Sequence, residues 1–191
     1  MLCESRLCES RLHVGRDVPW VSSWSDEAML GVRPCPTAQG RLAMHQAQRP
    51  GLGAPEFPKH HLNRQRASVW HMLCPMCGRP TDETDRWTHA ATATTAGDLR
   101  AQGLAHLLPE PALAPDRQRV LNAGAIAPMH RDCAEVALAH CPQLHVADAE
   151  LRRFPERWTV APVMITVGPP PPALGPEAQV VSFLLLCGLE G

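Results

Sequence analysis

Two short stretches carry the clearest signal in this chain: Cys74–Gly78, which reads CPMCG, and His130–Cys133, which reads HRDC and is separated from Cys77 by 52 residues. Each stretch places two metal-ligand side chains three positions apart. Two thiolates at this spacing turn inward on one ion when the chain forms a tight knuckle, and Gly78 allows the positive φ that such a turn tends to need. The first stretch therefore predicts half of a metal site.

The same C-x-x-C spacing also occurs in thioredoxin-like redox pairs, where a strand precedes the pair and a helix begins at it. Here Gly78, Pro80 and Asp82 follow the pair and predict a loop. The local sequence thus favours metal binding over redox exchange.

The second stretch supplies the remaining ligands. Residues 131–140 read RDCAEVALAH and predict a helix that ends before Pro142. Positions three apart lie on one helix face, and the first turn of a helix stabilises a thiolate. Three thiolates and one imidazole would fill the tetrahedron of a structural Zn²⁺ and leave no open coordination position, in a treble-clef-like order of knuckle and helix. The predicted metal ligands are Cys74, Cys77, His130 and Cys133.

Other residues are alternatives for the fourth ligand. Cys141 lies eight residues after Cys133, roughly 12 Å along an unbroken helix, so it replaces His130 only if the helix ends early. Further candidates are His89, His140 and His145. Cys35 and Cys187 have no partner at ligand spacing and are expected to be small buried or free thiols.

The composition limits both the core and the choice of partner. The 191 residues include 20 Pro and 13 Gly but only 4% aromatic residues, which excludes a large aromatic core running from end to end. A net charge of -1 excludes a highly basic nucleic-acid coat. A structural zinc would replace part of the missing core, because it contributes folding free energy on the order of 10 kcal/mol.

The two ends of the chain favour a cytoplasmic protein without a membrane segment. The apolar stretch Val180–Leu189 is about half the length of roughly 20 residues that a spanning helix requires. Residues 1–12 contain charges and no uninterrupted apolar run of the kind found in signal peptides. In a reducing compartment, clustered cysteines are expected to be metal ligands rather than disulfides.

The chain is predicted to be small and α+β, with a treble-clef-like zinc-binding core and irregular Pro-rich extensions. Its expected regions are a flexible tail with a repeated LCESR over 1–17, short strands within 18–48, the zinc-binding core over 49–145, a strand-containing extension over 146–167, and a Pro-rich linker with an apolar segment over 168–191. We expect the four consecutive prolines of that linker to set the last segment apart from the rest.

Within these regions the local patterns predict individual elements. Strands are expected over 18–24, 40–48 and 158–167, the last confined to a sheet edge or a bulge by Pro162. Helices are expected over 63–73, with Ala67, Trp70 and Met72 on the buried side, and over 98–108. The remaining expectations are an ordered loop over 49–61, a loop or hairpin over 81–97 and one helical turn over 117–122.

The predicted core carries further motifs: RPGLGAPEF over 49–57, a histidine at 60 or 61, RQR over 64–66 and CPMCGRP over 74–80. With these motifs the chain resembles a set of uncharacterised small proteins from high-GC actinobacteria, in which a second C-x-x-C precedes a short helix ending in C-P-x-L. Here His130 stands in place of the first of those cysteines, followed by Cys133, Cys141, Pro142 and Leu144. The resemblance covers about half of the chain and implies a zinc-finger-like fold without an established activity, and the Pro-rich C-terminal region departs from the family's usual tail.

Three functions compete at this point. The first is a non-enzymatic interaction module with a protein or nucleic-acid partner, for which Lys59, Arg64 and Arg66 would make an anion contact unless they form an ordinary solvated helix face. The second is an HNH-type nuclease, which would recruit His89 and Asn122 for a catalytic metal, although Thr88 stands where such enzymes carry an acid. The third is a zinc-containing DNA-binding regulator.

Overall fold

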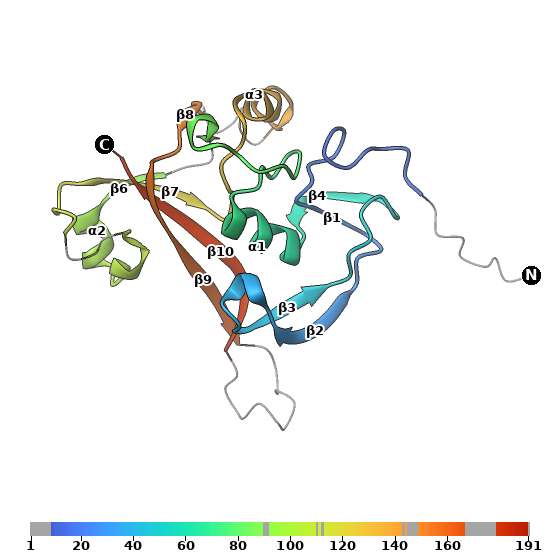
Figure 1. Ribbon diagram of the computed structural model, residues 1–191, viewed down its shortest axis with the longest axis horizontal. Helices are drawn as coiled ribbons and strands as arrows, with labels where there is room; N and C mark the ends of the chain where they lie inside the picture. The colour runs from blue at the N-terminus through green and yellow to red at the C-terminus, as the bar shows by residue number, and fades with distance from the viewer. Residues whose placement is uncertain are drawn as a thin grey trace, which may run out of the picture.

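The computed structural model describes residues 9–89, 92–109, 111, 113–142, 144, 149–166 and 179–190. The strands are β1 (Ser22–Trp24), β2 (Met29–Pro34), β3 (Leu42–Gln46), β4 (Pro55–His60), β5 (Trp87–Thr88), β6 (Thr92–Thr95), β7 (Arg119–Gly124), β8 (Arg152–Arg153), β9 (Arg157–Thr166) and β10 (Gln179–Leu189). The helices are α1 (Leu62–His71), α2 (Ala96–Ala101) and α3 (Arg131–His140), with 3-10 turns η1 (Pro36–Ala38), η2 (Glu83–Asp85) and η3 (Ala105–Leu107). This mixture of helix and sheet confirms the α+β class (Figure 1).

The apolar C-terminal segment is the central strand of the main sheet. Strand β9 pairs antiparallel with β10 along one edge, while β3 pairs in parallel at Val181 and β7 pairs antiparallel at Leu186–Leu189. Strands β2 and β6 extend the sheet beyond β3 and β7. Because β10 is covered on both faces, most of its side chains are buried, which explains its nearly continuous apolar sequence. The expectation that this segment is set apart from the rest was therefore wrong.

Helix α1 closes a gap along the edge of β10 between β3 and β7. The Gln65 amide donates to the carbonyl oxygens of Leu184 and Ala125, both at 2.8 Å, and its oxygen accepts the Leu184 N–H at 3.1 Å. Arg66 donates to the carbonyl oxygens of Ser182 at 2.7 Å and Met44 at 2.6 Å. These side chains bond backbone groups that the gap would otherwise leave buried without partners, at a cost of about 1–3 kcal/mol each.

The buried face of α1 is consequently more polar than predicted. Met72 and Val69 are buried, and Trp70 packs at the rim of the core. Ala67 is only half-buried, whereas Gln65 and Arg66 are fully buried. Apolar periodicity therefore predicted the position of the helix but missed the side chains that anchor it.

A buried ion pair ties α1 to the N-terminal part of the chain. The Arg64 guanidinium donates to both carboxylate oxygens of Glu27, at 2.6 and 2.8 Å, and to the Ser22 carbonyl at 2.6 Å. Glu27 also accepts the backbone N–H groups of Trp24 and Arg49. Since both charged side chains are almost fully buried, this network joins three segments that are distant in sequence.

Several predicted elements are confirmed. Helix α3 spans the predicted residues 131–140, α1 occupies most of 63–73, and β3 lies within 40–48. Strand β9 lies at an edge of the sheet, as Pro162 requires, because it pairs only with β10 among the described strands. Cys35 and Cys187 are buried thiols without a disulfide.

Other elements differ from the prediction. The loop expected over 49–61 contains strand β4, whose prolines are tolerated because, among the described strands, β4 pairs with β1 alone. The helical turn expected over 117–122 was wrong, because Arg119–Gly124 form β7 between β6 and β10. The helix expected over 98–108 begins earlier, at a capping box between Thr95 and Asp98, and stops at Ala101. Strand β2 was not predicted, since its exposed residues show no alternating pattern.

Among the described residues, no helix combines the length and the apolar character needed to cross a bilayer.

We predict that Glu27→Ala lowers the free energy of unfolding by about 3–5 kcal/mol, because it leaves the Arg64 guanidinium buried without its counter-charge. The matched control is Glu56→Ala, which removes the exposed pair with Lys59 and should cost less than about 1 kcal/mol. Urea unfolding of both variants measures the difference, and equal losses would contradict a special role for the buried pair.

Candidate metal centre

The knuckle forms directly after α1 ends. Met72 adopts a left-handed conformation, with φ of 50°, and its N–H bonds to the Ser68 carbonyl, which stops the helix. The N–H of Gly78 then donates to the Cys74 carbonyl, and the N–H of Cys74 donates to the Arg79 carbonyl, both at 2.8 Å. Gly78 has a φ of 75°, as the predicted turn requires. The two cysteines therefore lie on one side of a closed turn.

The start of α3 is held beside this turn by backbone pairing. Met129 and strand β5 exchange two hydrogen bonds of 2.8 Å, and the chain then enters α3 with His130 at the N-cap. The Asp85 carboxylate accepts the N–H of Arg131 at 2.9 Å, which satisfies a free donor at the helix end. Cys133 lies in the first turn, so it projects from the same end of the helix as His130.

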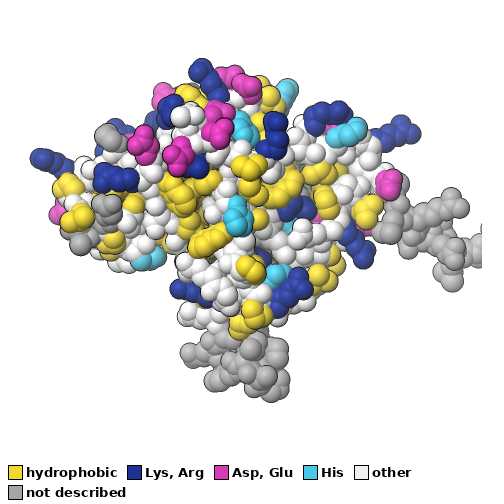
Figure 2. All heavy atoms as spheres, viewed as in Figure 1, with side chains coloured by type: hydrophobic (Ala, Val, Ile, Leu, Met, Phe, Trp, Pro, Cys, Tyr) yellow, Lys and Arg dark blue, Asp and Glu magenta, His cyan; other side chains and the backbone are white. Residues whose placement is uncertain are grey.

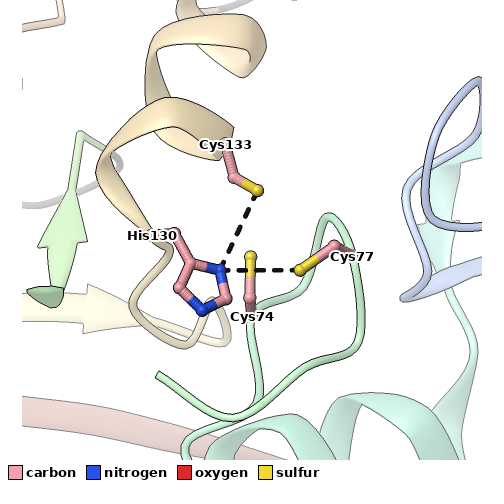
Figure 3. Close-up of side chains that lie close together, drawn as sticks. All are labelled: Cys74, Cys77, His130 and Cys133. Carbon is pink, nitrogen blue, oxygen red and sulfur yellow. Dashed lines mark hydrogen bonds between the residues drawn. The ribbon is translucent and has the colours of Figure 1, made fainter. Parts of the chain in front are cut away.

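The four predicted ligands meet at one point (Figure 3). Their ligand atoms, three Sγ and one imidazole nitrogen, all lie within 4.8 Å of one another. His130 Nδ1 is 3.5 Å from the Sγ of Cys77 and 3.9 Å from the Sγ of Cys133. A tetrahedral zinc with Zn–S of about 2.3 Å and Zn–N of about 2.0 Å separates its sulfur and nitrogen ligands by about 3.5 Å. The residues therefore fit a four-coordinate ion of this size.

The imidazole of His130 is oriented for metal binding. Its Nε2 donates to the Pro80 carbonyl at 2.9 Å, and a carbonyl can only accept, so the proton is on Nε2. Nδ1 then presents its lone pair toward the three sulfur atoms. Such a bond on the distal nitrogen typically fixes the tautomer and ring position of a ligating histidine. Sequence reasoning missed the Pro80 carbonyl because no spacing rule points to a backbone group.

The thiols have unequal pKa values in the chain without an ion. Burial raises the pKa of Cys74, which is fully buried. Burial and the charges of the other two cysteines raise the pKa of Cys133 to about 12. Burial acts in the same direction on Cys77, but hydrogen bonds from Arg79, Cys74 and Cys133 together outweigh it and lower the pKa to about 7. Three thiolates at this site therefore need a bound cation to offset their mutual repulsion.

The alternative ligands do not join this group. Cys141 is the C-cap residue of α3, at the opposite end of the helix from His130, and His140 precedes it. Among the described residues, the group of four is the one metal-binding cluster, and it contains neither of these residues nor His89. His145 lies outside the described residues.

The predicted anion contact is wrong for two of its three residues. Arg64 and Arg66 are buried and bond Glu27 and backbone carbonyls, so they are not available to an external anion. Lys59 is exposed but pairs with Glu56 at 2.5 Å. The sequence predicted a surface position for Arg64 and Arg66 because their buried hydrogen-bond partners lie far away along the chain.

No family model matches the chain, and neither curated proteins nor solved structures gave a match. Its function is therefore inferred from its own geometry.

We predict that Cys133→Ser lowers zinc affinity by more than about 100-fold, because loss of a ligand exceeds the 10–100-fold cost of losing an outer-shell contact. Cys141→Ser is the matched control, since it changes a free cysteine on the same helix and should leave the affinity unchanged. Competition with a chromogenic chelator measures both. Equal losses in the two variants, or none in Cys133→Ser, would contradict the ligand assignment.

Proposed function

We propose that this chain is a zinc-binding protein with one structural zinc, and that it acts as a non-enzymatic interaction module. The observation that carries the proposal is the convergence of Cys74, Cys77, His130 and Cys133, with all four ligand atoms within 4.8 Å. Thiolate and imidazole ligands in this combination are typical of zinc. Four protein ligands leave no position for a reactive water, which favours a structural over a catalytic ion.

The proposed zinc would join two elements that share little other packing. The core cluster at the site is small, with Cys74, Met129, Ala134 and Ala137 as its buried members. The ion would connect the end of α1 to the start of α3 through coordinate bonds, which add to the apolar contacts of this cluster. Its folding contribution is therefore concentrated at this junction.

We further propose that the centre is treble-clef-like. The knuckle, the pairing of β5 with Met129 and helix α3 follow one another in the order of that fold. The chain between β5 and Met129 contains β6, α2 and β7, two of which are strands of the main sheet. The unusual distance between the two ligand pairs is thus explained by an insertion that completes the sheet.

On the face that carries α3, the charges agree better with a protein partner than with a nucleic acid. On the face shown in Figure 2, basic and acidic side chains are interleaved above α3, so this face offers no field of a single sign. Arg131, Glu135 and Asp132 are examples on the helix itself, and the first two form an ion pair of 2.9 Å. Phosphate backbones are bound by clustered positive charge, which this face lacks.

Elemental analysis tests the metal directly. We predict about one zinc per chain, and a fall in melting temperature of about 10 °C or more after chelation, because each kcal/mol shifts the midpoint of a chain of this size by about 2–4 °C. Restoring zinc should restore the midpoint, whereas magnesium should not, since it prefers oxygen ligands. A metal-free protein with an unchanged midpoint would contradict the proposal.

One observation keeps the nuclease as a second candidate. Both ring nitrogens of His89, which directly follows β5, are buried and have no hydrogen-bond partner among the described residues, and burial lowers the pKa of the imidazole. A neutral histidine can act as a general base. Asn122, however, uses its side-chain oxygen to accept the Gly124 N–H at 2.9 Å, and the described residues contain no second metal cluster.

A plasmid-nicking assay with magnesium or manganese separates the two candidates. For an interaction module we expect no cleavage above background, both in the unmodified protein and in His89→Ala. Metal-dependent nicking that His89→Ala abolishes would instead establish the nuclease.

A further inference from the structure

The outer side of the knuckle is covered by an N-terminal segment, residues 13–21. The backbone N–H of Trp20 donates to the Met76 carbonyl at 2.8 Å, and the N–H of Val21 donates to the Pro75 carbonyl at 3.0 Å. In Figure 3 the blue N-terminal ribbon passes on the Cys77 side of the turn, away from α3. The two residues between the knuckle cysteines are therefore bonded to this segment through their carbonyl groups.

Side-chain packing adds to these bonds. A Cβ placed on Gly78 would lie 2.7 Å from the indole ring of Trp20, so the ring rests directly on the glycine backbone. On the same side, a Cβ on Gly15 would lie 3.3 Å from the Cys77 carbonyl oxygen. The segment thus contacts the knuckle from Pro75 through Gly78.

Beyond Val21 the chain is held by a different set of contacts. The Val21 carbonyl accepts the N–H of His61, and the Ser22 carbonyl accepts from Arg64. The Trp24 N–H donates to the buried Glu27 carboxylate at 2.9 Å. Val21 is therefore the boundary between two sets of contacts. Up to its N–H group the chain is bonded to the knuckle, and from its carbonyl group onward it is bonded to α1 and the buried ion pair.

We propose that metal occupancy controls the docking of residues 13–21 onto the knuckle, an inference that rests on the proposed structural zinc. The Pro75 and Met76 carbonyls lie between the two knuckle cysteines, whose sulfur atoms the proposed ion would tie to each other and to α3. Without the ion, the backbone bonds of the turn remain, but the two sulfur atoms can separate and the turn can move away from α3, which displaces the Pro75 and Met76 carbonyls. The N–H groups of Trp20 and Val21 then exchange their partners for water, while the chain from Ser22 onward stays in place.

Amide hydrogen exchange of the full chain tests this inference, with zinc bound and after removal by a chelator. We expect the Trp20 and Val21 amides to exchange at least about tenfold faster without zinc, as local opening predicts. The Trp24 amide, only a few residues further on, should keep its protection because Glu27 holds it.

A pair of glycine variants separates docking from metal binding. Gly78→Ala drives a methyl group into the Trp20 ring but retains all four ligands. Gly40→Ala introduces a methyl at nearly the same φ, 76° against 75°, with no atom within 4 Å. We expect both variants to retain zinc, and only Gly78→Ala to accelerate the Trp20 and Val21 amides. Trp20→Ala should reproduce this effect without backbone strain.

The outcomes distinguish the inference from the function on which it rests. One zinc per chain, with Trp20 and Val21 amides that stay protected after its removal, overturns the inference alone. Equal acceleration of the Trp24 amide overturns it as well, because the ion would then control the whole fold. A chain that takes up no zinc overturns both.

Discussion

The convergence of three cysteines and one histidine on a single point is the central feature of this structure. Cys74 is fully buried, and its sulfur lies within 4.8 Å of two other sulfur atoms and an imidazole nitrogen. In such a site the anionic forms repel one another and lose hydration, so a divalent cation is the natural compensation. Two segments distant in sequence, the end of α1 and the start of α3, bring their side chains together at this one point.

Hydrogen bonds from buried side chains provide the second source of order. Helix α1 presents Gln65 and Arg66 to open backbone groups of the main sheet, and Arg64 to the Glu27 carboxylate. Such networks stabilise most when their groups are paired, because an unpaired buried charge is costly. A chain with few aromatic residues thus combines a modest apolar core with directional bonds and, as proposed, a metal ion.

Local signals were sufficient for some elements. The alanine-rich run before Pro142 predicted α3 at its observed bounds, and Pro162 predicted that β9 lies at an edge. The ligand spacing selected the four residues that converge, since their chemistry is local to each pair. Elements whose conformation is set by a partner strand were missed. Strands β4 and β7 form because their backbones hydrogen-bond to β1 and β10, and neither stretch has a local sequence pattern that predicts this pairing.

The four candidate metal ligands could be selected from local sequence alone, because residue type and a spacing of three positions suffice to place two ligands on one turn or one helix face. The positions of the charged residues of α1 and the identity of the central strand became clear from the folded structure. Arg64 and Arg66 are spaced like surface residues, but they are buried because their partners come from β1, β3 and β10, far away along the chain. Burial of a charge depends on groups brought near by folding, and that information is not contained in any local stretch of sequence.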